Sequence, residues 1–69
     1  MGRYVAVVPT SATEVTFYDM VKNGNIFRIM QVTDGLVIGS PTFAGGSCSI
    51  ICQEQGHTCI VQYSMPGLQ

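Results

Sequence analysis

The stretch that decides the fold is EVTFYDMVKNGNIFRIMQVT, residues 14–33, because Asn23-Gly24 lies between two runs rich in β-branched and aromatic residues. Asn-Gly is the dipeptide best suited to a two-residue hairpin turn, since both turn positions need positive φ. Such a turn produces four compatible cross-strand pairs: Val21 with Ile26, Asp19 with Arg28, Phe17 with Met30, and Val15 with Val32. Residues 14–22 and 25–33 are therefore predicted to form antiparallel strands.

A helix over residues 12–22 is the alternative. Ser11 and Glu14 have the spacing of a capping box, and Gly24 is suited to end a helix. Val15, Phe17 and similar residues favour strands. The hairpin is the favoured interpretation, and the helix stays open.

Further strands are predicted on both sides of this hairpin. Asp34-Gly35 is a second hairpin dipeptide, which adds a strand over 36–43 and completes a three-stranded meander. RYVAVVP, residues 3–9, is nearly continuous in apolar residues, which is typical of a buried strand. TCIVQYSM, residues 58–65, is predicted to be the last strand.

Residues 45–56, GGSCSIICQEQG, are predicted to form a short helix. Ser47 can cap its first turn, and Gly56 can supply the left-handed residue that ends it. Four residues recur at the helical spacing i, i+3, i+4, i+7: Cys48, Ile51, Cys52 and Gln55.

These elements predict one small α+β domain over residues 1–69, in the order β-β-β-β-α-β, with one helix packed on one face of an antiparallel sheet. If 12–22 were helical, the order would be βαββαβ, the ferredoxin-like arrangement.

The predicted meander has apolar residues on both faces. One face carries Val15, Phe17, Val21, Ile26, Met30, Val32 and Val37, and the other carries Tyr18, Met20, Phe27, Ile29, Leu36 and Ile38. One helix can cover only one face, so the second face is expected to be covered by a partner. A symmetric homodimer is the simplest form of that arrangement.

The composition of the chain favours association with a protein partner or with itself over binding to nucleic acid. The chain of 69 residues is 46% hydrophobic and 10% charged, and its formal net charge is −1. So little positive charge gives no electrostatic reason to bind nucleic acid or an anionic membrane. We expect a cytoplasmic protein, because no signal peptide or membrane span is recognisable and an odd number of cysteines fits reduced thiols.

The three cysteines and the single histidine lie close together in the sequence, at Cys48, Cys52, His57 and Cys59. These residue types can hold zinc, and a tetrahedral site is geometrically possible. The spacing is irregular, however, and free cysteine commonly packs as a small apolar residue. Packing is the favoured interpretation, and a small zinc-binding domain is an alternative.

We therefore predict a non-catalytic protein–protein interaction module, acting stoichiometrically as a small accessory or inhibitory protein of the kind that phages and mobile elements encode. No catalytic residues, cofactor or metal are assigned. The predicted partner-binding residues are Tyr18, Met20, Phe27 and Ile29, because aromatic residues and methionine are enriched at interface centres. The other alternative is single-stranded nucleic-acid binding, with Tyr18 and Phe27 as stacking platforms.

Overall fold

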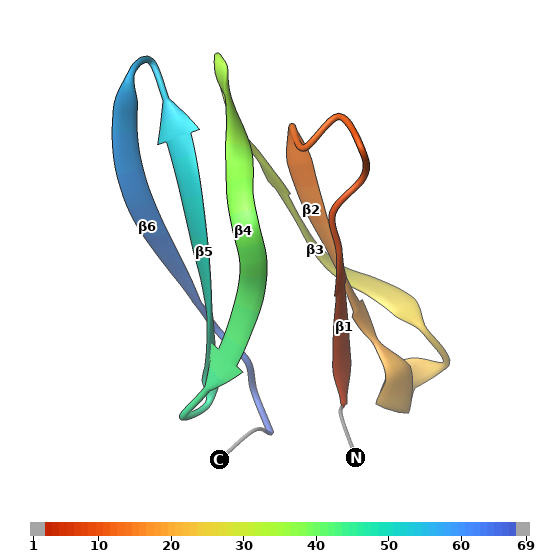
Figure 1. Cartoon of the computed structure of the whole chain (residues 1–69). Coiled ribbons are helices and arrows are strands. Elements are labelled where there is room, and N and C mark those ends of the chain that lie inside the picture. The colour runs from red at the N-terminus through yellow and green to blue at the C-terminus, as the bar shows by residue number, and fades with distance from the viewer. Residues whose placement is uncertain (1–2, 68–69) are drawn as a thin grey trace.

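The computed structural model describes residues 3–67 and shows two three-stranded antiparallel sheets (Figure 1). The strand order is β1-β2-β3 in the first sheet and β4-β5-β6 in the second. The bounds are β1 Tyr4–Val7, β2 Glu14–Asp19, β3 Asn25–Gln31, β4 Gly35–Ala44, β5 Ser47–Glu54 and β6 His57–Ser64, with a short 3₁₀ helix η1 at Met20–Lys22. The predicted α+β class is wrong, in both the β-β-β-β-α-β and the ferredoxin-like order, because the two segments expected to be helical contain strands β2 and β5, and residues 3–67 include no helix of seven or more residues.

The predicted hairpin around Asn23-Gly24 forms with a longer loop, and its register differs from the predicted one by two residues at Val15 and by three at Asp19. Val15 pairs with Met30 rather than with Val32, and Asp19 ends β2. The Asp19 side chain accepts a hydrogen bond from the amide of Val21 and so begins η1. The last three residues of the predicted strand, 20–22, therefore form η1 instead. The loop between the two strands is longer than two residues, and the cross-strand pairs differ from the predicted ones.

The predicted meander of residues 14–22, 25–33 and 36–43 does not include its third strand. β4 was expected to pair with β3 across Asp34-Gly35, but it pairs with β5 instead. Gly35 lies so close to β5 that a Cβ on it would stand 1.7 Å from the carbonyl oxygen of Gln53. Glycine therefore serves here to bring two strands together and not to close a hairpin.

The predicted helix over residues 45–56 is a strand with a tight turn at each end. Gly45 and Gly46 have φ values of 59° and 83°, and Gln55 and Gly56 have 52° and 80°. Positive φ at both central residues is the signature of the two-residue hairpin turn that matches the twist of the strands. The residues between the turns alternate with period two in this strand, which places Cys48, Ile50 and Cys52 on one buried face.

The two sheets bury their inner faces against each other. β2 contributes Val15 and Phe17, and β5 contributes three fully buried side chains. The Phe17 ring meets the edge of the Tyr63 ring with centroids 5.7 Å apart, which joins the sheets through an aromatic pair. Among residues 3–67, the buried apolar core consists of Tyr4, Val15, Phe17, Met30, Val32, Val37, Cys48, Ile50, Cys52 and Met65.

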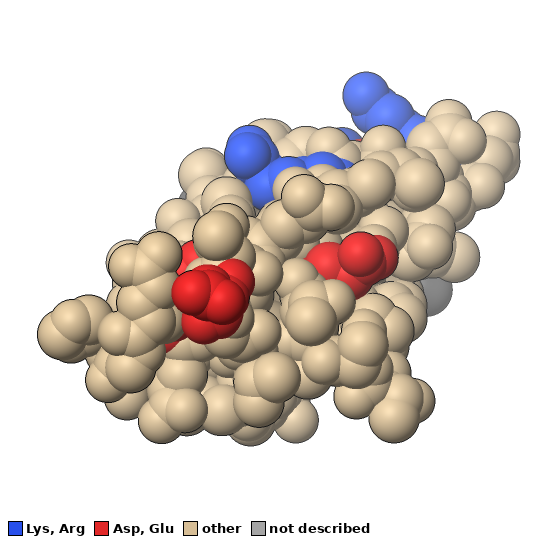
Figure 2. Space-filling model, turned by 90° about the horizontal axis from the view of Figure 1, so that it is seen from above, with Lys and Arg blue, Asp and Glu red and all other residues tan. Residues whose placement is uncertain are grey.

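Charged side chains are sparse on the surface. Figure 2 shows basic and acidic groups standing apart, with uncharged surface between them. This follows from a composition that is only 10% charged. Most of the surface seen in that view therefore offers no electrostatic barrier to contact with another uncharged surface.

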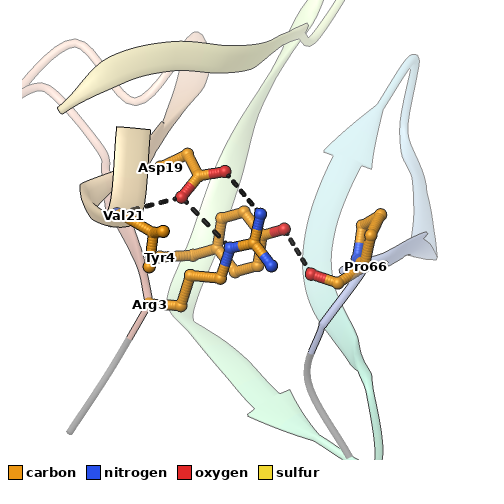
Figure 3. A network of polar contacts seen from close by, with 5 residues as sticks. All are labelled: Arg3, Tyr4, Asp19, Val21 and Pro66. Carbon is orange, nitrogen blue, oxygen red and sulfur yellow. Dashed lines mark hydrogen bonds and ion pairs between the residues drawn. The ribbon is translucent and has the colours of Figure 1, made fainter. Parts of the chain in front are cut away.

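A polar network ties the beginning of the described chain to its end (Figure 3). Arg3 forms an ion pair with Asp19, and the Tyr4 hydroxyl donates a hydrogen bond of 2.5 Å to the carbonyl oxygen of Pro66. Tyr4 begins β1 in the first sheet, and Pro66 follows β6 of the second sheet, so this bond connects the two sheets. The aromatic body of Tyr4 is buried in the core while its hydroxyl has a partner, as buried tyrosine requires.

Candidate functional site

Two cysteine thiols face each other across β5 and β6. Cys52 and Cys59 are directly paired in the strand register, and their Sγ atoms are 3.0 Å apart. The Gln55-Gly56 turn lies midway between them in the sequence, so the hairpin necessarily places them opposite each other. Both are free thiols.

A carboxylate completes this cluster. Glu54 directs Oε1 toward the Cys59 Sγ at 3.8 Å, while its Oε2 accepts a hydrogen bond of 2.9 Å from the Thr33 amide. One ligand atom from each of Cys52, Glu54 and Cys59 lies within 4.8 Å of the others. We call these three residues the thiol cluster. Its groups can undergo thiol–disulfide chemistry or supply part of the coordination shell of a soft metal ion.

Burial controls the ionisation of the inner thiol. Burial raises the pKa of the Cys52 thiol to about 11, and its hydrogen bond with Cys59 and the charge of Glu54 act in the same direction. Burial also raises the pKa of Cys48. Both thiols are therefore protonated and poorly nucleophilic at neutral pH.

The structure does not bring together the four residues considered for zinc. Cys48 and Cys52 lie on the same extended strand, and four residues along a strand span about 13 Å. Cys48 is fully buried in the core, and His57 is exposed beside the turn. Only Cys52 and Cys59 of that set are neighbours.

The four predicted partner-binding residues are divided between different surfaces. Ile29 is exposed on the outer face of the first sheet, on the same side as Tyr18, and Met20 is exposed in η1. Phe27 instead packs against the core, with its ring centroid 5.1 Å from that of Tyr4. The register shift beside Tyr18 turns Phe27 inward, so the two proposed stacking aromatics do not share a face.

The outer face of the second sheet carries a row of isoleucines that sequence reasoning missed. Ile51 pairs with Ile38 of β4 on one side and with Ile60 of β6 on the other. Directly paired residues share a face, so the three side chains form a line across the strands. Ile60 is 66% exposed and Ile51 is 41% exposed. We call Ile38, Ile51 and Ile60 the isoleucine row.

Leu36 extends the isoleucine row along β4, and it is also exposed. The signal for this surface was in the sequence, because Ile51 and Ile60 are equidistant from Gln55-Gly56, just as the two cysteines are. It was missed because residues 45–56 were assigned to a helix, in which Ile51 would face the core.

The outer face of the first sheet is also apolar. Val7 pairs with Thr16, which pairs with Ile29, and the next row contains Val5, Tyr18 and Ile26. Apolar residues on both faces were predicted for a three-stranded meander, which the structure divides between two sheets; the β2–β3 hairpin is apolar on both faces, and the second sheet rather than a helix covers its inner one. Val21 and Ile26, expected on the covered face, are both exposed: Val21 lies in η1 rather than in a strand, and the register shift beside Tyr18 places Ile26 opposite Tyr18 on the outer face.

Comparison of the chain with protein-family models, with curated proteins and with solved structures gave no significant match. Within residues 3–67, the helical content is too short to cross a bilayer.

Proposed function

We propose that this chain is a non-catalytic protein-interaction module, acting stoichiometrically as a small accessory or inhibitory protein, and that its first partner is a second copy of itself. The single observation that carries the proposal is the isoleucine row on the outer face of the second sheet. It ends at Ile60, which is 66% exposed on the edge strand β6. Covering these isoleucine side chains with another apolar surface removes them from water, which contributes favourable free energy to association.

Of the four edge strands, β6 has the fewest features that prevent pairing with another chain. β1 has only four residues and is soon followed by Pro9, β3 carries Arg28 and a register shift, and β4 carries Pro41 and a second register shift. Proline, charge, bulges and short length all protect edges. β6 has eight residues, no proline, aspartate, glutamate, lysine or arginine, and an uninterrupted register with β5.

The hairpin geometry specifies which backbone groups of β6 are available. Residues that flank a two-residue turn exchange hydrogen bonds, and bonded pairs then alternate along an antiparallel ladder. Glu54 and His57 flank the turn, so the backbone groups of Thr58, Ile60 and Gln62 point away from β5. These groups can pair with the same groups of a second β6 strand.

A two-fold axis at Ile60 gives the best pairing of two such edges. It sets Ile60 opposite Ile60 of the second copy, and Thr58 opposite Gln62 of the second copy. The result is one continuous six-stranded sheet in which two isoleucine rows join end to end. A two-fold axis also places like residues near one another, and an edge strand without aspartate, glutamate, lysine or arginine keeps like-charge repulsion low.

The basic residues give further support to a protein partner over nucleic acid. Arg3 is engaged with Asp19, and the Arg28 guanidinium lies over the rings of Phe27 and Tyr63, at 5.7 and 4.8 Å from their centroids. Two of the three cationic side chains are therefore occupied within the fold. We place the module in the cytoplasm, because free thiols at all three cysteines suit a reducing compartment.

Sedimentation equilibrium over a range of concentrations tests this proposal. We expect the parent chain to be a dimer and Ile60→Lys to be a monomer, since the substitution puts two charges at the axis. The matched control is Ile29→Lys, which alters an exposed isoleucine of the first sheet and should remain dimeric. A parent chain that stays monomeric at every concentration would refute self-association.

Amide hydrogen exchange measured by NMR tests the register. In the dimer, the amide of Ile60 should exchange slowly, whereas in Ile60→Lys the amide at position 60 should exchange quickly. The amides of Cys59 and Val61, which point toward β5, should be protected in both chains. A parent dimer in which the Ile60 amide exchanges quickly would show that β6 is not the interface.

A further inference from the structure

We infer that Cys52 and Cys59 form a reversible dithiol–disulfide pair that exchanges with small disulfides. Their Sγ atoms are 3.0 Å apart and belong to residues paired directly across the ladder. Paired residues of this kind have Cα atoms about 5.5 Å apart, which lies within the range that a disulfide spans. The sulfurs must approach by about 1 Å to form the bond, a movement that side-chain rotation can supply.

The two thiols differ in access, which assigns them different roles. Cys52 is fully buried, whereas Cys59 is only partly buried at the neighbouring position of the edge strand. A small disulfide can therefore reach the Cys59 sulfur first. Cys52 then acts as the resolving thiol, because it can reach only the sulfur that faces it. The third thiol, Cys48, lies about 13 Å along β5 from Cys52 and cannot take part.

The exchange has two balanced steps. The Cys59 thiol loses its proton to water, and the thiolate attacks one sulfur of the small disulfide, forming a mixed disulfide and expelling one small thiolate. The Cys52 thiol then loses its proton and attacks the Cys59 sulfur, which expels the second small thiolate. The expelled thiolates take up the two protons. Two electrons have passed from the protein sulfurs to the small disulfide.

A metal ion fits this cluster less well than a disulfide does. Zinc bound by two thiolates at 2.3 Å in tetrahedral geometry holds the sulfurs about 3.8 Å apart, farther than the 3.0 Å between Cys52 and Cys59. The thiol cluster also supplies three ligand atoms, whereas structural zinc takes four. The residues considered as further ligands, Cys48 and His57, are not part of it.

The bond would change the hairpin that carries the isoleucine row. It would link β6 to β5 at a position separated from the turn by two residue pairs, and next to Ile60. Cross-linking also restricts the unfolded chain, so the oxidised protein should unfold at a higher temperature than the reduced protein. This consequence follows from the hairpin alone and does not depend on the proposed dimer.

The test treats reduced, folded protein with bis(2-hydroxyethyl) disulfide, a small neutral probe. We expect free thiols to fall from three to one per chain, the mass to fall by two hydrogens, and peptide mapping to join Cys52 to Cys59. Cys52→Ala should instead accumulate a mixed disulfide at Cys59. Cys59→Ser, altered at the more exposed thiol, should keep both of its remaining thiols free.

Three results would overturn the inference. The first is stable adducts on the parent chain without loss of the two hydrogens. The second is a bond that involves Cys48. The third is an unreactive parent chain that binds cobalt(II) stoichiometrically with a thiolate charge-transfer band that Cys59→Ser lacks, which would assign the cluster to a metal.

Discussion

The guanidinium of Arg3 and the carboxylate of Asp19 meet at two points, with Nε 3.1 Å from Oδ1 and Nη2 3.0 Å from Oδ2. This fork geometry holds the segment before β1 against the end of β2, in the same network that includes Tyr4 and Pro66 (Figure 3). The hydrogen bonds from Arg3 hold the pKa of the Asp19 carboxyl below its ordinary value, and the charge of Arg3 and the Val21 amide add to that effect.

The first prediction is that Asp19 makes the fold sensitive to acid. Because its pKa is lower in the folded chain, Asp19 contributes stability above the unfolded pKa of about 3.9, and that contribution is lost as the pH falls through the lower folded value. Asp19→Asn should therefore lower stability at neutral pH and flatten its decline in acid. Urea unfolding from pH 7 to pH 2.5 measures both effects.

Asp34→Asn is the matched control, because Asp34 is exposed and asparagine tolerates its positive φ of 58°. With this substitution, the free energy of unfolding should decline between pH 7 and pH 2.5 as steeply as it does in the parent chain. Equal flattening in the two variants would show that the ion pair with Arg3 is not responsible.

The second prediction concerns the aromatic contact between the sheets. Phe17 is fully buried against Tyr63, so Phe17→Ala should cost about 3–5 kcal/mol through lost burial and the cavity left behind. Phe43→Ala, at a ring that is 38% exposed near the end of β4, should cost about 1 kcal/mol or less. Chemical unfolding followed by circular dichroism compares them, and similar costs would mean that Phe17 is not central to the core.

Local patterns in the sequence were sufficient to locate five of the six strands. Apolar and β-branched runs predicted strands at 3–9, 14–22, 25–33, 36–43 and 58–65, and the structure has strands within or nearly at all of these ranges. The choice of partner strand could not be predicted in the same way. Asp34-Gly35 has the composition of a hairpin turn, but its effect depends on Gly35 approaching Gln53, which lies 18 residues farther along the chain.

The error over residues 45–56 has a similar cause. Cys48 and Cys52 fit a helical repeat with Ile51, and they fit a strand repeat with Ile50 equally well. The two flanking turns and the neighbouring strands decide between these periods. The turns are local features, whereas pairing with β4 and β6 depends on residues elsewhere in the chain. Once the hairpin is assigned, the thiol cluster and the isoleucine row follow from counting outward from Gln55-Gly56.

The third prediction concerns the turn between β5 and β6. Gln55 has a φ of 52°, a left-handed conformation that is unfavourable for most side chains and more favourable for asparagine. Gln55→Asn creates the preferred Asn-Gly turn and should raise stability by about 0.5–1 kcal/mol. Gln53→Asn, an exposed position within β5, should not stabilise the chain, since asparagine is unfavourable in strands. Thermal unfolding measures both variants, and a less stable Gln55→Asn would contradict the assigned turn.

The fourth prediction is that the fold weakens in alkali because of its buried thiols. The pKa of the Cys52 thiol is raised from its ordinary value of 9.0 to about 11 in the folded chain. Below pH 9.0 the thiol is mostly protonated in both the folded and the unfolded chain, so its contribution to stability is retained there. As the pH rises toward 11 the unfolded chain ionises first, and stability is lost across that window. Cys48 acts in the same direction.

Urea unfolding of fully reduced protein between pH 8 and pH 11 measures this loss. Cys52→Ala should be less stable than the parent chain at pH 8, because it leaves a cavity, but its stability should fall less steeply as the pH rises. Cys48→Ala should also flatten the decline, since its buried thiol is removed in the same way. Parallel curves for all three proteins would mean that these thiols ionise equally in the folded and unfolded chains, which would contradict their burial.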